Sequence, residues 1–177
     1  MKKLKSFWED KRVLITGHTG FKGSWLLALL NKLGSQTFGY ALKPEESPAL
    51  FDDLFLNVFA KSSSRNFIND INDFDALKKA VSSAKPDIVF HLAAQPLVRK
   101  SYINTLETWK TNVIGTLNLL ESLKNLDNKC SVVIVTTDKV YKNNEWEYGY
   151  RENDELGGKD PYSASKSATE LLVASWR

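Results

Sequence analysis

The chain has 177 residues, 42% of them hydrophobic, and its 24 lysines and arginines against 21 aspartates and glutamates give a formal net charge of +3. This length and composition are typical of one globular domain with a single apolar core. A surplus of three positive charges does not indicate a nucleic acid or a membrane surface as partner, because such binding requires clustered basic residues. We therefore expect neither partner.

Targeting and redox signals are also absent from the sequence. The longest apolar run, Trp25–Leu30, is far shorter than the roughly 20 residues of a membrane-spanning helix. The segment Met1–Lys11 lacks the apolar core and cleavage site of a signal peptide. A single cysteine, Cys130, excludes an internal disulfide and a cysteine zinc site. These features predict a cytoplasmic protein without a metal centre.

Short apolar segments that alternate with helical patterns run along the chain. The predicted strands are Arg12–Thr16, Thr37–Ala41, Arg65–Ile68, Asp87–Leu92 and Ser131–Thr137. The predicted helices are Gly23–Leu33, Pro48–Phe55, Phe74–Ser83, Thr105–Lys124 and Pro161–Trp176. This alternation predicts a doubly wound, Rossmann-like α/β fold with a parallel sheet in the order 3-2-1-4-5.

Two stretches are predicted to be loops, Lys43–Ser47 and Asn143–Lys159. The second is long, aromatic and charged, which indicates a function or a packing partner. The last predicted helix is still apolar near Leu172 and Trp176, whereas a doubly wound dinucleotide domain usually continues into a sixth strand. We therefore expect residues 1–177 to form a dinucleotide-binding domain that stops before the sixth strand and before a substrate-binding lobe.

A glycine turn joins the first strand to the first helix, with Gly17, Gly20 and Gly23 at intervals of three. Glycines at this spacing let backbone approach a pyrophosphate, and the helix N-terminus faces its negative charge. Phe21 and Lys22 belong to the same candidate site, where Lys22 either adds a cation to the phosphate site or is only solvated. The alternative for the whole segment is a tight turn without a ligand.

The residues after the second and third strands are the candidates for binding the adenosine part of the cofactor. No acidic residue for the ribose hydroxyls occurs in Gly39–Lys43, about 20 positions after the turn, so both NAD and NADP remain open. Lys43 leaves room for the extra phosphate of NADP. After the third strand we expect Asp70, followed by Ile71, to accept a hydrogen bond from adenine, and Asp73 to cap the next helix.

Small residues follow the fourth strand. Leu92, Ala93 and Ala94 would let the backbone pass close to a cofactor. His91, at the end of that strand, is interpreted as a buried and hydrogen-bonded residue rather than as a base.

The most specific pattern is a tyrosine and a lysine four residues apart, Tyr162 and Lys166, at the start of the last helix. This spacing places both side chains on one helical face, where the ammonium is expected to lower the Tyr162 pKa from about 10. Tyr162 is thus a candidate base for a sugar or alcohol hydroxyl. Thr137, Asp138 and Lys139 follow the fifth strand, at the edge where ligands bind in such sheets, or else form a turn of exposed charges.

The chain resembles the nucleotide-sugar branch of the extended short-chain dehydrogenase/reductases in the segments GHTGFKGSWL, HLAAQPLVRKSY, TWKTNVIGTLNLLES, VVIVTTDKVY and GYRENDELGGKDPYSASKSATELLVASWR. The TTDK and GYRENDELGGKDPYSASK segments are far more specific to this branch than the glycine turn. The resemblance covers essentially the whole chain. It implies an enzyme that runs on one bound NAD.

The resemblance also implies roles for the candidate catalytic residues. Tyr162, assisted by Lys166, would remove the proton of the sugar O4 while hydride leaves C4 for the nicotinamide and Thr137 hydrogen-bonds O4. The 4-keto group acidifies C5, water is lost across C5 and C6, and the hydride returns to C6. Asp138 fits the acid that protonates the departing O6 hydroxyl. Lys139 stands where relatives acting on dTDP-glucose have a glutamate base, and would have to be neutral through burial or cationic neighbours such as Lys166.

Two helix residues and two loop residues complete the implied site. Thr111 would lie near the cofactor and Asn112 would be a structural and proton-relay position, although both also suit an ordinary helix interior. Asn69 and Asn72 replace a glycine and an arginine that are frequent in the family. Asparagine tolerates a left-handed backbone, so the loop around Asp70 is expected to survive these changes.

The implied substrate is CDP-glucose, for deoxysugar and surface polysaccharide synthesis, and the implied partner is a second copy in the full-length enzyme. The dimer would pack through Thr105–Lys124 and Pro161–Trp176. The alternatives are a related nucleotide-sugar epimerase or reductase, and a cofactor-binding fragment without turnover. The Asp138-Lys139 pair favours dehydration, since an epimerase needs no acid at O6. We expect turnover only from a longer chain.

Overall fold

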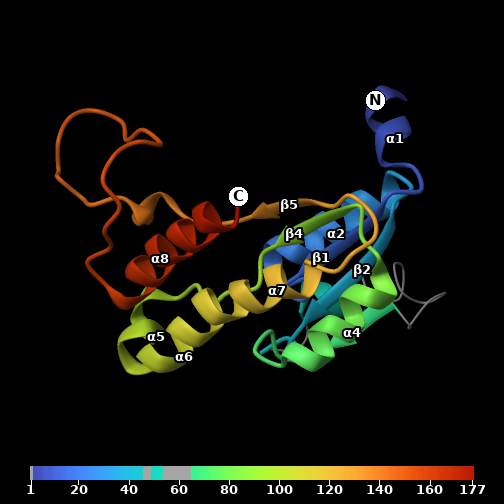
Figure 1. Ribbon diagram of the computed structural model, residues 1–177, viewed down its shortest axis with the longest axis horizontal. Coiled ribbons are helices and arrows are strands. Elements are labelled where there is room, and N and C mark those ends of the chain that lie inside the picture. The colour runs from blue at the N-terminus through green and yellow to red at the C-terminus, as the bar shows by residue number, and fades with distance from the viewer. Residues whose placement is uncertain (1, 46–48, 54–64) are drawn as a thin grey trace. The chain divides into compact units, whose positions relative to one another are not determined.

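The computed structural model describes residues 2–45, 49–53 and 65–177 (Figure 1). The chain divides into two compact units. The first comprises Met1–Ala93 and Glu121–Val135, and the second comprises Ala94–Leu120 and Thr136–Arg177. No helix among the described residues combines the length and the apolar character needed to cross a membrane.

A five-stranded parallel sheet forms the centre of the first unit (Figure 1). Its strands are β1 (Arg12–Thr16), β2 (Gln36–Ala41), β3 (Asn66–Ile68), β4 (Ile88–His91) and β5 (Ser131–Ile134). They lie in the order β3-β2-β1-β4-β5, as predicted, and β1 is central because Val13 pairs with Thr37 on one side and with Ile88 on the other. The doubly wound Rossmann-like fold is thus confirmed.

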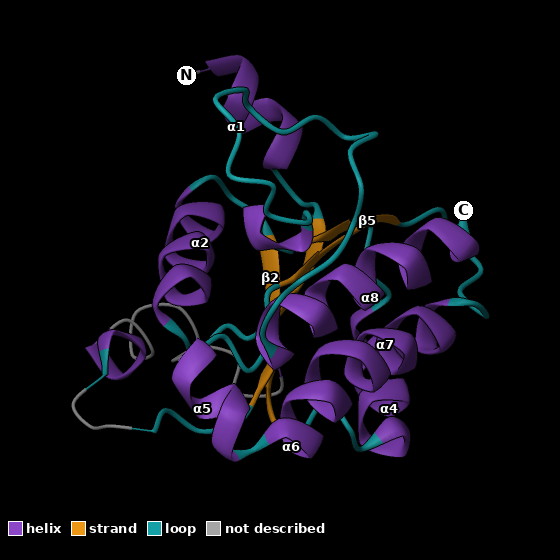
Figure 2. Cartoon of the chain, turned by 90° about the vertical axis from the view of Figure 1, so that its left-hand side faces the viewer, coloured by secondary structure: helices purple, strands orange, loops and turns teal. Residues whose placement is uncertain are grey.

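Helices α2 (Phe21–Lys32) and α4 (Phe74–Ala84) cover opposite faces of this sheet (Figure 2). Val13 and Ile15 of β1 share a buried cluster with Leu27 and Leu30 of α2. Because side chains alternate along a strand, the intervening Leu14 points to the other face, where α4 packs on β1 and β2. Both faces of β1 are thus buried, with one helix on each face.

In the first unit, one predicted helix cap is confirmed and one helix is present that was not predicted. The Asp73 carboxylate accepts a hydrogen bond from the Ala76 amide at 3.0 Å, so its predicted role as the cap of α4 is confirmed. An unpredicted helix, α1 (Lys2–Trp8), precedes β1, and its Trp8 ring lies 6.2 Å from the ring of Phe90. Of the helix predicted at 48–55, residues 48, 54 and 55 lie outside the described residues, and 50–53 are helical.

The second unit is built around the helix α8 (Pro161–Trp176). The elements packed against it are α5 (Val98–Ile103), α6 (Thr105–Trp109), the π-helix η2 (Lys110–Ile114) and the 3-10 turn η3 (Asp138–Val140). Figure 1 shows α8 in red beside α5 and α6 in yellow-green. The α8 boundaries match the prediction, since the Asp160 carboxylate caps the Ser163 amide at 3.0 Å and Pro161 occupies the first turn.

The prediction of one regular helix over Thr105–Lys124 is wrong. The segment consists of three pieces, α6, η2 and α7 (Gly115–Leu123). At the π-helix the carbonyl of Asn112 accepts from two hydroxyls, Thr116 at 2.7 Å and Thr169 of α8 at 3.1 Å. These hydroxyls satisfy a carbonyl at the place where the regular hydrogen-bond ladder is interrupted.

The fifth strand is shorter than predicted, and the helix α5 is present although it was not predicted. β5 ends at Ile134 instead of Thr137, because its neighbour β4 ends at His91 and the last ladder bond runs from the Val135 amide to the His91 carbonyl at 3.1 Å. Helix α5 was not predicted, since its segment has no clear apolar period. Thr136 and Thr137 are therefore released from the sheet.

Candidate functional site

The glycine turn of the first unit is closely packed. Gly17 has a φ of +74°, and a Cβ there would lie 2.7 Å from the Ala93 amide nitrogen. A Cβ on Gly23 would lie 2.1 Å from the Gly17 carbonyl oxygen, so α2 can approach the turn only with glycine at this position. A Cβ on Gly20 would meet only ordinary contact at 3.4 Å. Two of the three glycines are thus required by packing, and Gly20 leaves the start of α2 uncovered.

The N-terminus of α2 has the features of an anion site. Gly20 is its N-cap, no side chain hydrogen-bonds the cap position, and the first turn holds no acidic residue. Phe21 is 74% exposed, and Lys22 is also exposed. Uncapped amides, the helix dipole and a nearby lysine suit a pyrophosphate. The residues present therefore fit the phosphate part of a dinucleotide.

The predicted adenine-side residues form a small ordered turn after β3. The Asp70 carboxylate accepts from the Asn72 amide at 2.8 Å and from the Asn72 side chain at 3.0 Å. Its backbone carbonyl accepts from the Tyr40 hydroxyl at 2.9 Å, while Ile71 is buried. This turn keeps Asp70 at the end of β3 with its side chain exposed.

The end of β4 lies against the glycine turn, within the first unit. The Ala93 amide donates to the Thr16 hydroxyl at 3.2 Å, and the same hydroxyl lies 2.6 Å from His91 Nδ1. His91 is buried, so its interpretation as a satisfied strand residue is confirmed. Leu92 and Ala93 follow it, and Ala94 begins the second unit.

His18, inside the glycine turn, is a residue to which sequence reasoning assigned no role. Its ring is fully buried, its Nε2 lies 2.7 Å from the Asn66 side-chain oxygen, and it meets Phe51 edge to face. Burial lowers the pKa of His18 from 6.5 to about 4. A Cβ on Gly39 would overlap this ring, so His18 and a glycine of β2 fit together and link the turn to the sheet.

In the second unit, one hydroxyl connects three predicted catalytic residues. Thr137 donates to the Asp138 carboxylate at 3.0 Å, and its hydroxyl also hydrogen-bonds the Tyr162 side chain. The Lys139 amide donates to the same oxygen at 3.4 Å, as η3 begins. The Lys139 side chain is exposed, so the described residues do not supply the burial that its implied role as a neutral base demands.

The pKa shifts of the tyrosine and lysine pair differ from the sequence-based expectation. Burial raises the pKa of Tyr162, the Thr137 hydrogen bond opposes that rise, and the Asp138 and Asp160 carboxylates add to it. The predicted lowering of the Tyr162 pKa is therefore wrong, because burial outweighs the opposing hydrogen bond. Burial also lowers the pKa of Lys166 from 10.5 to about 8, although the charge of Glu170 raises it.

Asn112 is the centre of a buried hydrogen-bond network. Its side-chain oxygen accepts from the Gln95 amide at 2.9 Å, and its nitrogen donates to the Gln95 carbonyl at 3.2 Å and to the Ser165 hydroxyl at 2.8 Å. Ser165 in turn donates to the Tyr162 carbonyl at 2.7 Å. Thr111, the preceding residue of η2, is half-buried. The network fixes the backbone that carries Tyr162, a structural connection in keeping with the position implied for Asn112.

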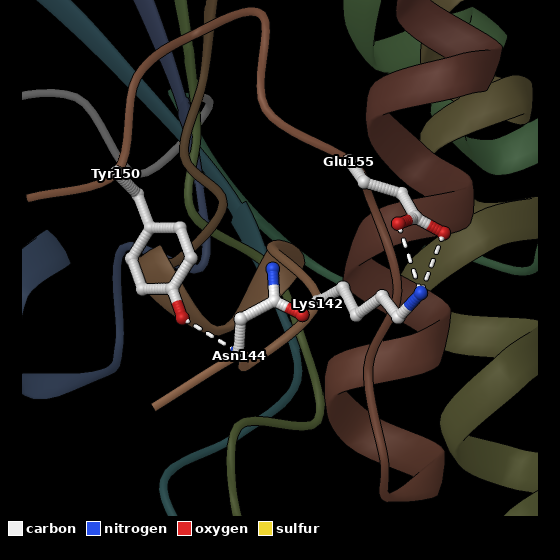
Figure 3. A network of polar contacts seen from close by, with 4 residues as sticks. All are labelled: Lys142, Asn144, Tyr150 and Glu155. Carbon is white, nitrogen blue, oxygen red and sulfur yellow. Dashed lines mark hydrogen bonds and ion pairs between the residues drawn. The ribbon is translucent and has the colours of Figure 1, made fainter. Parts of the chain in front are cut away.

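Side-chain contacts join the two sides of the loop between η3 and α8. The Lys142 ammonium pairs with the Glu155 carboxylate at 2.9 Å, and the Tyr150 hydroxyl accepts from the Asn144 amide at 2.9 Å (Figure 3). The Tyr150 ring stacks on Tyr141 with centroids 5.3 Å apart. The two predicted catalytic segments are thus joined by a hairpin-like connection with exposed aromatic side chains.

The predicted ligand-binding and catalytic residues fall into different units. The glycine turn, Asp70 and the end of β4 belong to the first unit, whereas Thr137, Asp138, Tyr162 and Lys166 belong to the second. In residues 2–45, 49–53 and 65–177 no group of three histidine, cysteine or acidic side chains could hold a metal ion. Sequence reasoning missed Ser165 and Glu170, for which the helical spacing from Tyr162 was the available signal.

Comparison with known proteins shows the family of the chain. A family model described as GDP-mannose 4,6-dehydratase matches residues 14–177. The chain belongs to this family. It is 50% identical over 98% of its length to CDP-glucose 4,6-dehydratase of Salmonella typhimurium, of which it covers 47%.

Solved structures in the same fold group extend the comparison. Pal from Bacillus thuringiensis matches with a TM-score of 0.81 and 27% identity over 93% of this chain and 51% of its own. MoeE5, solved with UDP-glucuronic acid and NAD, matches with a TM-score of 0.73 and 27% identity over 93% of this chain and 48% of its own. The chain thus spans about half the length of the GDP-mannose 4,6-dehydratase family relatives and structures it matches.

Proposed function

We propose that this chain carries the cofactor site and the catalytic residues of a CDP-glucose 4,6-dehydratase, which converts CDP-glucose to CDP-4-keto-6-deoxyglucose. The observation that carries the proposal is the Thr137 hydroxyl, which is hydrogen-bonded to both Tyr162 and Asp138. These contacts support Tyr162 as the base, Thr137 as the hydroxyl for the sugar oxygen and Asp138 as the acid. The 50% identity to the Salmonella enzyme supports CDP-glucose as the substrate.

The cofactor proposed is NAD, with NADP as the alternative. The uncapped start of α2 and the glycine turn suit its pyrophosphate, and MoeE5, a relative in fold, was solved with NAD. The proposed contacts are Gly17, Gly20, Phe21, Lys22, Gly23, Asp70, Ile71, Leu92, Ala93, Ala94, Thr111, Asn112, Tyr162 and Lys166. Held by these residues, NAD would supply the hydride-transfer chemistry between sugar C4 and C6.

The protein's own side chains would move the protons. Tyr162, with Lys166 one helical turn away, would take the O4 proton while Thr137 hydrogen-bonds O4. Burial raises the pKa of Tyr162, and a charged Lys166 close to the phenol would oppose that rise by favouring its ionised form. Asp138 would protonate the departing O6 hydroxyl, and Lys139 would take the C5 proton acidified by the 4-keto group.

The proposed oligomeric state is a homodimer, and the proposed location is the cytoplasm. Apolar side chains remain exposed on helices of the second unit, which fits the dimer that the family resemblance implies. They are Tyr102, Ile103, Leu106, Leu171 and Trp176. Sedimentation of the purified protein at increasing concentration tests the dimer.

One assay tests the function and separates its alternatives. The 177-residue chain and a longer form are each incubated with CDP-glucose and NAD, and the products are analysed by mass and NMR. Loss of one water with a 4-keto group identifies a dehydratase. An isomer of unchanged mass identifies an epimerase, and cofactor binding without any product identifies a binding fragment. We expect the dehydrated product, and only from the longer form.

A further inference from the structure

Three ionisable side chains follow one another along one face of α8. Tyr162, Lys166 and Glu170 are spaced by four residues, so each lies one helical turn from the next. The middle one is the most deeply placed, since Lys166 is only 4% exposed. A buried ammonium is costly unless a negative charge lies near it, and Glu170 is the adjacent carboxylate on this face.

Two neighbouring threonines hold the two ends of this row. Thr137 hydrogen-bonds the Tyr162 side chain, and Thr136 donates a short hydrogen bond to the Glu170 carboxylate. Both threonines lie in the segment released after β5, and both bonds stay within the second unit. One short stretch of backbone therefore sets the positions of the tyrosine and of the glutamate on either side of Lys166.

Other charges around α8 do not replace Glu170. The ionisable residues of the packed elements are Arg99, Lys100, Tyr102, Glu107, Lys110, Asp138 and Lys139. Glu170 is the residue whose charge acts on the pKa of Lys166, raising it against the effect of burial. With that pKa at about 8, the ammonium keeps only a narrow margin above neutral pH.

We propose that Glu170, oriented by Thr136, is a positioning residue that keeps the Lys166 ammonium charged and in place one turn from Tyr162. Its effect on the reaction rests on the proposed function, because Lys166 would act there through Tyr162. Its effect on Lys166 itself requires no substrate. Removing the carboxylate is expected to make Lys166 neutral at a lower pH, and the phenol would then lose the cation that favours its ionised form.

The direct test is an NMR titration of Lys166 in the 177-residue chain with ¹³C-labelled lysine, the resonance being assigned with Lys166→Arg. In Glu170→Gln we expect the Lys166 pKa to fall by about one pH unit relative to the parent. Glu170→Asp, which keeps the charge, should restore most of the difference. Glu107→Gln removes an exposed acidic charge from α6 of the same unit and should leave the Lys166 titration unchanged.

A Lys166 pKa that is unchanged in folded Glu170→Gln overturns the proposal. A fall of the Lys166 pKa in Glu107→Gln as large as in Glu170→Gln also overturns it. If Glu170→Gln does not fold by circular dichroism, Thr136→Val decides, with Thr136→Ser as its control. Folded Thr136→Val should lower the Lys166 pKa while Thr136→Ser does not, and identical titrations in both would refute the role of Thr136.

Turnover gives a second readout in an active, longer form. The high-pH decline of kcat should begin about one pH unit lower in Glu170→Gln, with the KM for CDP-glucose nearly unchanged. Absence of a 4-keto product from the parent would count against the proposed function alone. The lysine titration would still decide the role of Glu170.

Discussion

The side-chain nitrogen of Asn112 donates a hydrogen bond to the Ser165 hydroxyl over 2.8 Å, and this bond joins the π-helix to α8. Because Ser165 also donates to the Tyr162 carbonyl, the irregular turn in one helix is linked through Ser165 to the first turn of the predicted catalytic helix. π-turns inside helices recur at functional sites. Here the π-turn presents a fully buried amide whose oxygen and nitrogen both have partners.

Replacing Asn112 by alanine should destabilise the second unit. The change leaves the buried Gln95 amide and carbonyl without their side-chain partner, which costs about 2 to 4 kcal/mol of unfolding free energy. Urea denaturation followed by circular dichroism measures the loss. Lys110→Ala, at an exposed position of the same π-helix, is the control and should change stability by less than about 0.5 kcal/mol. Equal stability of the two variants would contradict the role of the network.

Alanine at Gly23 should disturb both folding and cofactor binding. Its Cβ would lie 2.1 Å from the Gly17 carbonyl, so the turn or α2 must shift, at a cost of about 1 to 3 kcal/mol. Gly149→Ala is the matched control, because nothing lies within 4 Å of a Cβ there. Thermal unfolding and NAD titration calorimetry should show losses for the first variant only. A Gly23→Ala protein as stable as Gly149→Ala would show that the turn has more room than described.

The buried Lys166 should make stability depend on alkaline pH. Its pKa is about 8 in the folded protein against 10.5 ordinarily, so between these values the unfolded chain binds more protons. Its contribution to stability is therefore full above pH 10.5 and is lost as the pH falls through about 8, a change of about 3 kcal/mol. Relative to Lys166→Met, the parent's unfolding free energy should rise across this window. Parallel curves for the two proteins would argue against a buried ammonium.

His18 should titrate in the acid range. Its pKa of about 4 lies below the ordinary 6.5, so the stability it contributes is full above pH 6.5 and is lost as the pH falls through about 4. The expected loss is about 3 kcal/mol. NMR of the two histidine rings measures the titration directly. A His18 ring that titrates near 6.5 would show that it is not buried in solution.

Lys139→Gln tests the proposed base at C5. In an active form of the protein incubated with CDP-glucose in D₂O, the variant should lose solvent exchange of the C5 hydrogen, because an amide cannot accept that proton. Lys159→Gln, at an exposed position in the following loop, should exchange at the parent rate. Exchange in Lys139→Gln at the parent rate would assign the C5 proton to another group.

Much of the fold followed from local patterns. The β-branched runs and the Asp160-Pro161 cap predicted β1 and α8 with their observed boundaries, because strand period and helix capping are encoded by neighbouring residues. The glycine spacing likewise predicted the turn, and packing explains Gly17 and Gly23. The order of strands followed from the alternation of strands and helices.

What the sequence determined by itself was thus the order of the elements, the glycine turn and the pairing of Tyr162 with Lys166 on one helical face. Only the tertiary structure decided the break at Asn112, the direction of the Tyr162 pKa shift and the contact of Thr136 with Glu170. Each of these depends on burial or on a partner more than 20 positions away in the chain. Desolvation and distant hydrogen bonds arise only when the chain has packed, so no local spacing predicts them.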